Sequence, residues 1–448
     1  MHSIESILNS ISDIVWGPYM LALLVGTHLF LTFRLKFIQR HIFTAIKLSL
    51  SKKREGKGDV SQFGALMTAL AATIGTGNIV GVATAISLGG PGAVLWMWLT
   101  GVFGIATKYS EALLSVKYRV VEPDGSMAGG PMFVLERGLK SKWLAVIFAV
   151  MTAIAAFGIG NMVQANSIAS LLKESFNIQP WISGSVITLF TGFVILGGIK
   201  KIAKVCEGLV PFMAIFYIVS CIVLLAMKWQ TIPASIALIL HSAFSGQAAI
   251  AGFAGSALKE AIRYGIARGL FSNESGMGSA PIVAAAAQTK NPVRQALVSS
   301  TGTFWDTVVI CALTGVVLVN SGLWTSGLKG VAFTKAAFDS FPVIGPIVLV
   351  VGLFTFVLST ILGWSYYGEI AIEYLFDYRA VRYYRWLWVI AVMVGSVATL
   401  PAVWAFADIA NALMAIPNLI SLLALNTVIV AETREYLWNN NLEKTENS

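Results

Sequence analysis

Charged residues are scarce in this chain. Aspartate, glutamate, lysine and arginine supply 12% of its 448 residues, whereas a soluble domain carries roughly 25%. So few charges could not give a solvated surface to a chain of this length. The composition therefore disfavours both a soluble multidomain enzyme and a disordered regulator.

Cysteine and histidine are scarce too. The three cysteines, Cys206, Cys221 and Cys311, lie inside apolar stretches without metal-ligand spacing or a pairing pattern, so we expect them to pack in the core. None of the four histidines has a nucleophile or metal ligand at a recognisable spacing, and nothing resembles a nucleotide-binding loop. An enzyme and an ATP-driven pump are therefore disfavoured.

Apolar residues, by contrast, make up 56% of the chain, and the mean hydropathy is +0.76. They gather in long segments, most of which reach the roughly 20 residues that cross a bilayer as a helix. The segments lack the alternation of barrel strands, so the sequence predicts an all-α membrane protein with about 11 transmembrane helices. They run approximately over residues 14–33, 62–88, 90–116, 143–171, 181–199, 205–227, 253–288, 295–319, 343–376, 384–400 and 402–431.

The net charge of +9 has a topological explanation. Most lysines and arginines fall in alternate loops, starting with segment 34–61, a pattern that sets orientation in a membrane. We expect a multi-pass protein of the cell membrane with its N-terminus outside and its C-terminus in the cytoplasm. A nucleic-acid partner is disfavoured, because it would gather charge on one contiguous face. Segment 34–61 could equally be an amphipathic helix on membrane lipid or a solvated loop.

Two apolar segments have polar, glycine-bracketed interruptions, Ile74-Gly75-Thr76-Gly77-Asn78 and the run from Phe271 to Gly278. Such residues weaken a helix. Either motif alone would more often serve close helix packing. Each, however, opens a block of five apolar segments. Together they predict two inverted halves with a binding site between them.

This organisation divides the chain into four parts. We expect an N-terminal transmembrane helix with the basic segment at 1–61, a first five-helix repeat at 62–228, a second repeat with its preceding loop at 229–431, and a cytoplasmic tail at 432–448. A broken helix exposes N–H groups that attract a carboxylate, and C=O groups that attract an ammonium or Na⁺. A pocket between two broken helices therefore suits a zwitterion such as an α-amino acid.

The sequence resembles the alanine/glycine:cation symporter family over essentially its whole length. The most specific runs are ATIGTGNIVGVATA at 71–84 and ARGLFSNESGMGSAP at 267–281. The resemblance implies uptake of alanine or glycine coupled to Na⁺, or in some members to H⁺. It also implies the fold of the bacterial leucine and neurotransmitter:sodium symporters, with a 5+5 inverted-repeat, leucine-transporter-like core and here one extra N-terminal helix.

The match to that wider fold implies a substrate site. Backbone groups from Gly75 to Gly77 and near Gly276 should bind the carboxylate, and carbonyls near Thr73 and Phe271 should receive the ammonium. Amides of the third core helix should contact the substrate, although buried amides usually join helices, and bulky side chains should limit its size. The implied site comprises Thr73, Gly75, Thr76, Gly77, Asn78, Asn161, Gln164, Phe271, Ser272, Asn273, Gly276, Met277 and Trp364.

The resemblance also implies a Na⁺ site of oxygen ligands between the first and eighth core helices. Ser359 and Thr360 would supply hydroxyls, and Ala71, Ile74 and Phe356 would supply backbone carbonyls. Without the resemblance, hydroxyls in a membrane helix most often bond to their own helix. No organic cofactor is implied.

Several ionisable residues lie inside apolar segments. Glu274 lies in the second interruption and is either a proton-coupling site or a cap for exposed N–H groups, which we favour because such breaks need polar partners. Lys108 and Glu111 are expected to form a structural pair. No role is assigned to Asp306, Glu207 and Asp408.

The sequence therefore predicts a secondary active symporter that couples Na⁺ influx to uptake of alanine or glycine by alternating access. The open alternative is an H⁺-coupled transporter of another small zwitterion. A channel is disfavoured, because it needs a continuous polar path or rings of charges or carbonyls.

Overall fold

The computed structural model describes residues 2–51, 56–123, 125–244, 257–398 and 401–445, and these residues are mostly helical. The first four residues of the predicted segment 253–288 lie outside the described residues, as do Lys52, Lys53 and Arg54 of the basic segment. The helices, in which η marks 3₁₀ and π turns, are α1 (His2–Val15), α2 (Pro18–Arg34), η1 (Ile38–His41), α3 (Ile42–Ser49), α4 (Gln62–Thr73), η2 (Thr76–Asn78), α5 (Val80–Gly89), α6 (Ala93–Lys117), α7 (Pro131–Phe133), η3 (Val134–Gly138), α8 (Lys142–Ala155), η4 (Ala156–Met162), α9 (Val163–Phe176), α10 (Pro180–Ile195), α11 (Gly198–Met227), η5 (Trp229–Thr231), α12 (Ile232–Phe244), α13 (Ala257–Asn273), α14 (Pro281–Ala284), α15 (Pro292–Thr303), η6 (Phe304–Cys311), α16 (Ala312–Asn320), η7 (Leu323–Thr325), α17 (Gly330–Asp339), α18 (Ile344–Phe376), η8 (Tyr378–Ala380), α19 (Val381–Val397), α20 (Pro401–Ala424), α21 (Asn426–Thr433) and η9 (Arg434–Trp438).

A small antiparallel hairpin follows α6 and was not predicted. It pairs β1 (Val120–Val121) with β2 (Met127–Ala128). The rest of the regular structure in the described residues is helical, which agrees with the predicted class.

By length and composition, four helices of the described chain could cross a membrane, and up to six could do so if each of two bent pairs is one span. The bent pairs turn by 66° and 59°. The number of eleven crossings therefore remains a prediction. The four helices are Lys142–Phe176, Gly198–Met227, Pro292–Asn320 and Ile344–Phe376, and the pairs are Pro18–Arg34 with Ile38–Ser49 and Asp408–Ala424 with Asn426–Trp438.

Both glycine-bracketed interruptions break their helices. Only the short turn η2 stands between the end of α4 and the start of α5, and residues 274–280 separate α13 from α14. At 1.5 Å per residue, the 12 residues of α4 are too short to cross a bilayer core of about 30 Å. Neither half of the first segment can therefore act as a spanning helix alone.

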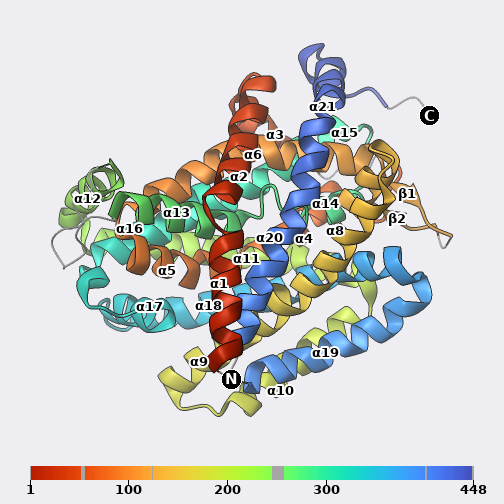
Figure 1. Ribbon diagram of the computed structural model, residues 1–448. Helices are drawn as coiled ribbons and strands as arrows, with labels where there is room; N and C mark the ends of the chain where they lie inside the picture. Colours follow the sequence, from red (N-terminus) through yellow and green to blue (C-terminus); the bar gives the residue numbers. More distant parts are fainter. Residues whose placement is uncertain (1, 52–55, 124, 245–256, 399–400, 446–448) are drawn as a thin grey trace.

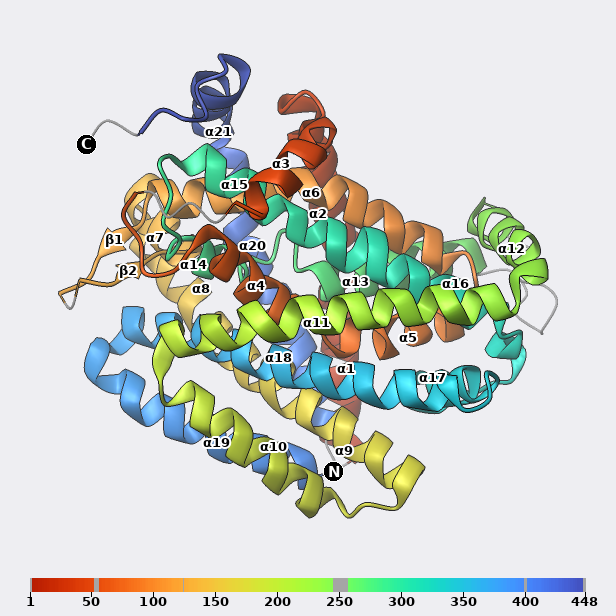
Figure 2. The ribbon, with the colours of Figure 1, turned by 180° about the vertical axis from the view of Figure 1, so that it is seen from behind.

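The broken helices lie in the interior, between longer helices. The helix α18 packs against α4, α8 and α11, while α13 packs against α5 and α6. Figure 2 shows α11 and α18 side by side across the molecule, with α10 and α19 paired along one edge. In Figure 1, α1 and α20 run together on the opposite face, and the two termini lie far apart.

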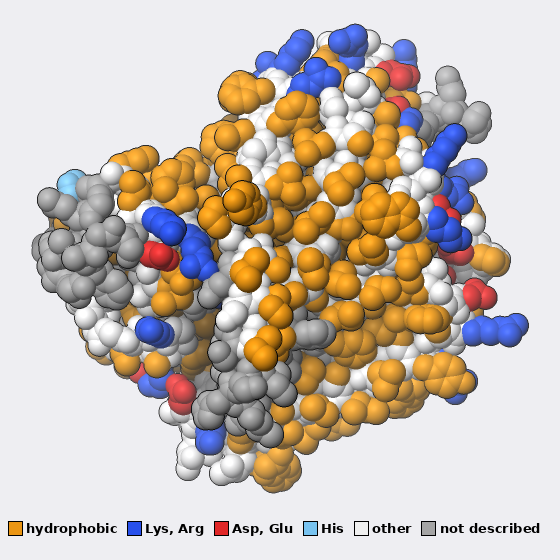
Figure 3. Space-filling view, viewed as in Figure 1, with side chains coloured by type: hydrophobic (Ala, Val, Ile, Leu, Met, Phe, Trp, Pro, Cys, Tyr) orange, Lys and Arg blue, Asp and Glu red, His pale blue; other side chains and the backbone are white. Residues whose placement is uncertain are grey.

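The surface in Figure 3 is hydrophobic over its middle, with lysine, arginine, aspartate and glutamate gathered toward the margins. Bulky apolar side chains on α10, α11 and α19 are widely exposed; Leu189, Phe193 and Ile215 have 76%, 73% and 62% of their surface free. So much exposed apolar surface suits lipid rather than water. Together with the long apolar helices, it fits a multi-pass membrane protein.

Loops at one end of the molecule tie the beginning of the first broken helix to the end of the second. Lys57 and Thr289 form one isolated bridge, and Val60 and Ala287 form another. Arg119, which follows α6, donates to the carbonyls of Lys57, Ala285 and Ala287 at 2.8–3.0 Å. We call this end, which carries the α14–α15 loop and the C-terminal residues, the tail face.

Candidate functional site

The first break is held open by side chains that take the N–H groups of the missing helical turn. In a continuous helix, Gly75 N and Thr76 N would donate to carbonyls four residues earlier. Here Gly75 N donates to Asn78 Oδ1 at 2.8 Å, and Thr76 N donates to Gln164 Oε1 at 3.2 Å. This diversion frees the carbonyl of Ala71 from its usual N–H partner.

The second break uses the same device. Ser275 N donates to Asn273 Oδ1 at 2.9 Å, while Gly276 N and Gly278 N both donate to Glu111 Oε1 at 3.0 Å. Gly276 and Gly278 have φ angles of +89° and +83°, which residues with a Cβ rarely adopt. The break therefore depends on both glycines and on a carboxylate from α6.

The two breaks meet at Gly77 and Asp306. A Cβ built on Gly77 would lie 3.3 Å from both the Phe271 ring and the Ser272 Cα, so the two segments are in contact. Asp306, on the π-helical turn η6, accepts Asn78 Nδ2 on Oδ1 at 2.6 Å and Ser272 Oγ on Oδ2 at 2.9 Å. One buried carboxylate thus cross-links both breaks.

No role was predicted for Asp306, and Cys311 was expected to pack in the core. Cys311 Sγ also lies at this junction, 3.3 Å from Asn78 Nδ2 and 3.2 Å from Ser272 Oγ. The one available signal was a carboxylate inside the apolar segment 295–319, since such residues are functional candidates by default. Its partners could not be read from the sequence, because they come from two other helices.

The two amides of the third core helix have different surroundings. Gln164 Oε1 holds Thr76 N, and its Nε2 donates to Ile159 O in the π-helical turn η4 at 3.0 Å. Asn161 Nδ2 donates to Trp388 O on α19 at 2.9 Å. Gln164 therefore contacts the first break directly, whereas the side-chain NH₂ group of Asn161 connects η4 to α19.

Four of the five oxygens expected to bind Na⁺ lie together. Ser359 Oγ and Thr360 Oγ1 lie 3.4 and 3.2 Å from Ile74 O, and both lie 2.9 Å from Phe356 O. The residues are at most 1% exposed. Here the hydroxyls donate to the carbonyls, and hydroxyl lone pairs can turn toward a cation. Ala71, with the freed carbonyl, lies one turn before Ile74 on α4.

Glu274 does not cap the break, contrary to the favoured sequence interpretation. Its Oε1 accepts Trp364 Nε1 at 2.9 Å, and its Oε2 accepts a short hydrogen bond from Ser279 Oγ. Glu111 holds the N–H groups instead, because its α6 carboxylate reaches two of them at once. Glu274 therefore links the second break to α18 and is left available for the coupling role that was its alternative.

The expected pair of Lys108 and Glu111 forms neither a hydrogen bond nor an ion pair in the described part of the chain. Lys108 Nζ is buried there without a hydrogen-bond partner, while Glu111 Oε1 accepts Gly276 N, Gly278 N and Asn418 Nδ2. A spacing of three residues places both side chains on one helix face. The Glu111 carboxylate, however, accepts hydrogen bonds from the backbone N–H groups of the second break.

Lys108 instead borders a small cavity between the broken helices. The cavity has a volume of about 10 Å³, which is enough for about one water molecule. Its position places Lys108 on the tail-face side of the first break. It is lined by Ala69, Thr73, Lys108, Ala112, Ala280, Pro281, Ser299 and Gly302.

A second cavity, of about 80 Å³, reaches the second break from another direction. Arg268 lies over the Phe271 ring at 5.6 Å, and Trp16 Nε1 donates to Asp408 O at 3.0 Å. Phe271 therefore stands between this cavity and Gly77. The cavity is lined by Ser12, Trp16, Arg263, Tyr264, Ala267, Arg268, Phe271 and Asp408.

The remaining predicted residues are placed as follows. Thr73 Oγ1 bonds back to Ala69 O at 3.2 Å, while Thr76 Oγ1 is buried and has no hydrogen-bond partner among the residues that the structure describes. Phe271 packs with Ile159 in a small separate cluster, whereas Met277 belongs to the main apolar core. Trp364 belongs to that core too, on α18.

The fold is one that a known membrane protein shares. A crystal structure of MhsT in complex with L-phenylalanine superposes on 87% of this chain and 96% of its own, with a TM-score of 0.60 and 17% sequence identity. The chain thus shares the fold of MhsT, to which the leucine-transporter-like expectation corresponds.

The sequence matches the sodium:alanine symporter family over residues 1–448, and the chain belongs to that family. It is 52% identical to the sodium/alanine symporter AgcS of Methanococcus maripaludis, covering 98% of both chains. It is 35% identical to a Bacillus subtilis protein named “Probable sodium/glutamine symporter GlnT”, over 97% of this chain and 91% of that one. The chain is therefore a cation-coupled amino acid transporter and not an enzyme, and the resemblance noted in the sequence is confirmed.

Glu111→Ala tests the capping of the second break. Two buried N–H groups would lose their acceptor, at about 1–3 kcal/mol each, so we expect the free energy of unfolding in mixed micelles to fall by about 2–6 kcal/mol. Glu111→Gln keeps a carbonyl oxygen and should lose clearly less. Equal losses in the two variants would show that the charge, and not the capping, stabilises the break.

Proposed function

We propose that this protein couples Na⁺ influx to the uptake of a small neutral amino acid, alanine or glycine, by alternating access. The observation that carries the proposal is the meeting of two broken helices beside a cluster of two hydroxyl and two carbonyl oxygens. The name of the relative AgcS supports the choice of sodium and alanine.

The carboxylate of the substrate would bind at the first break. Within the described ranges Thr76 Oγ1 is buried without a hydrogen-bond partner, and a helix end attracts a carboxylate. The amide oxygens of Asn78 and Gln164, which now accept Gly75 N and Thr76 N, would yield these donors to the substrate. Two neutral amides can release an N–H group at lower electrostatic cost than a buried carboxylate could.

The ammonium would bind carbonyls at the ends of α4 and α13, near Thr73 and Phe271. Ser275 N, which would close the helix onto Phe271 O, is instead bonded to Asn273 Oδ1. Gly77 lies so close to Phe271 and Ser272 that a Cβ on Gly77 would be in tight contact with both, so the two breaks meet directly. The small size of the cargo is supported by the name of the relative AgcS.

Na⁺ would bind Ser359, Thr360 and the carbonyls of Phe356, Ile74 and Ala71. Oxygen ligands without sulfur or imidazole suit a hard cation. A Cβ on Gly75 would collide with Thr360 Oγ1, so α18 presses on the same peptide that offers its N–H to the substrate. Ordering of this contact by Na⁺ would raise substrate affinity, and the substrate would raise Na⁺ affinity equally.

Alternating access would move the broken helices against the rest of the bundle. The repeats proposed at 62–228 and 229–431 would carry α4 to α11 and α13 to α20. The 80 Å³ cavity would lead to the site from outside, past Phe271. The tail face would lie in the cytoplasm, with the N-terminus outside, as the basic loops indicate.

Uptake by proteoliposomes tests the function. We expect labelled alanine or glycine to accumulate under an inward Na⁺ gradient. Without that gradient, the labelled amino acid should only equilibrate along its own concentration gradient. Labelled glutamine is the comparison substrate, because the relative GlnT is named for it. Accumulation under an H⁺ gradient alone would overturn sodium coupling, and no accumulation under either gradient would overturn this cargo.

Removing the hydroxyls tests the Na⁺ site. We expect Ser359→Ala and Thr360→Val each to raise the half-saturating Na⁺ concentration by about tenfold or more, because each deletes an oxygen ligand in a buried site. Thr355→Val is the matched control, since Thr355 Oγ1 bonds only to Val351 O and Gly352 O of its own helix. A control shift as large as the others would remove support for the site.

Proton coupling through Glu274 is the second candidate. It rests on a buried carboxylate that joins Ser279 on the break to Trp364 on α18. If a proton is carried there, Glu274→Gln should abolish the pH dependence of uptake while alanine binding persists. If alanine binding itself is lost, Glu274 is a scaffold for Trp364. Unchanged pH dependence with intact binding would exclude the proton role.

A further inference from the structure

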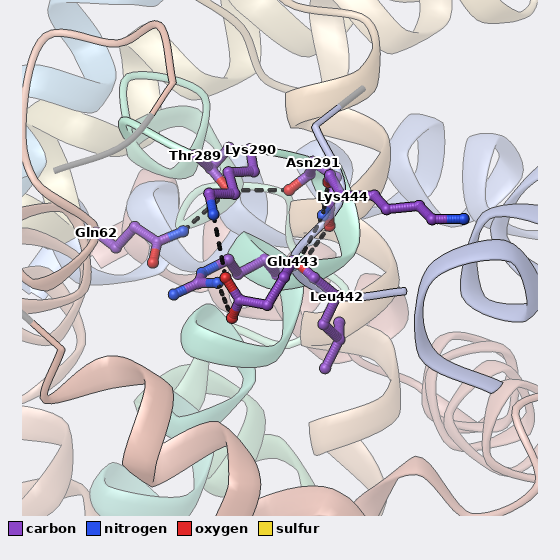
Figure 4. Close-up of polar contacts among 8 residues, drawn as sticks. Gln62, Thr289, Lys290, Asn291, Leu442, Glu443 and Lys444 are labelled. Atoms are coloured by element: carbon purple, nitrogen blue, oxygen red, sulfur yellow. Dashed lines mark hydrogen bonds and ion pairs between the residues drawn. The ribbon is translucent and has the colours of Figure 1, made fainter. Parts of the chain in front are cut away.

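The C-terminal residues are bonded to the tail face through buried side chains. Asn291 Nδ2 donates to Leu442 O at 3.0 Å and to Lys444 O at 2.9 Å. Glu443 forms ion pairs with Arg294 at 2.6 Å and Lys290 at 3.1 Å. Figure 4 shows the segment around Glu443 lying against the residues that open α15. We call these contacts the tail latch.

The tail latch is connected to the first broken helix through the side chain of Thr289. Thr289 Oγ1 donates to Asn291 O at 2.9 Å and accepts Gln62 Nε2 at 2.9 Å (Figure 4). Gln62 is the first residue of α4, and all three side chains are at most 5% exposed. A displacement of the start of α4 therefore has to break one of these two hydrogen bonds or move Asn291, and with it the contact to the tail.

The latch combines a strong part and a weak part. Asn291 is 1% exposed, and its Oδ1 also caps α15 by accepting Arg294 N at 2.9 Å, so its amide is held in place. The Glu443 side chain is 66% exposed, whereas the Arg294 side chain is only 5% exposed. Ion pairs open to water contribute little. The ion pairs of Glu443 therefore open at smaller cost than the hydrogen bonds of Asn291, and the cap on α15 does not depend on either.

Charge keeps the latch formed at neutral pH. Lys290 and Arg294 hold the pKa of Glu443 below its usual value by hydrogen-bonding to the ionised carboxylate. A group with a depressed pKa contributes its stability above the ordinary pKa and loses it as pH falls through the lowered value. The contact is therefore complete throughout the physiological range.

We propose that the tail latch restrains α4 in its packed position and so sets how readily the transporter opens at the tail face. This inference rests on the proposed function only in giving that opening a role in substrate release. The occupant is the chain's own segment around Glu443, and the receiving residues are Lys290, Asn291 and Arg294. Release of the tail would shift the resting population toward a state open at the tail face.

Two variants release the latch without removing the α15 cap. Asn291→Asp keeps an oxygen for Arg294 N, since aspartate and asparagine cap helices equally well, but loses both amide donors to the tail. Glu443→Gln removes only an exposed charge. The matched control is Glu435→Gln, which changes an exposed carboxylate in the same terminal region, outside the latch.

The readout is maleimide labelling of a cysteine at Ala69 in the full-length, detergent-solubilised protein. Ala69 borders the small cavity on the tail-face side of the break. We expect the labelling rate to rise about two- to fivefold in Glu443→Gln and about tenfold in Asn291→Asp, which loses two hydrogen bonds. Glu435→Gln should match the parent. The parent without the added cysteine corrects for the three buried native cysteines.

Labelling without Na⁺ or amino acid separates this inference from the proposed function. If the cargo is wrong but both variants label faster, the latch stands. If both variants fold, as judged by an unchanged melting midpoint, and label at the rate of the parent, the latch is overturned. A faster rate in Glu435→Gln as well would overturn it too, because general charge loss would then explain the effect.

Discussion

The constraint on which the structure depends is that a helix broken inside a membrane must still satisfy its backbone N–H groups. No water is available there to take them. The two breaks meet this need with side-chain oxygens: Asn78 and Gln164 accept at the first, and Asn273 and Glu111 at the second. Because those acceptors divert the N–H groups from the helix ladder, they also release carbonyls of the preceding turn, among them the carbonyl of Ala71 that the proposed Na⁺ site uses.

The same acceptors tie the breaks to the surrounding helices. Gln164 joins the first break to η4, and Glu111 joins the second to α6 and, through Asn418, to α20. Asp306 holds both breaks to η6. Neither broken helix can therefore shift alone, and any conformational change has to exchange several of these bonds together. Such a network favours a few discrete arrangements over continuous deformation.

The breaks could be predicted from sequence because glycines with polar neighbours stand out in an apolar segment. Ser359 and Thr360 were visible only through the family resemblance. The roles of Glu111 and Asp306 were not visible, because their partners lie 165 and 228 residues away and local spacing carries no information about them. Local spacing misled twice, by pairing Lys108 with Glu111 and by assigning the N–H groups to Glu274. For Glu111, the backbone N–H groups of the second break were better-placed partners than Lys108. For those N–H groups, the carboxylate from α6 was better placed than that of Glu274.

The buried charges also revise the picture of a site with little charge. Lys108, Glu111, Glu274 and Asp306 are each at most 3% exposed, so one cation stands among three carboxyl groups. A zwitterionic substrate would leave the net charge of this region unchanged. Where all three carboxyl groups are ionised, the region carries a negative excess that an added cation would lower, and this attraction is stronger in a medium of low dielectric constant than in water. The carboxylates that hold the breaks open thus also favour a positive ion, and not an anion, as the partner of the amino acid.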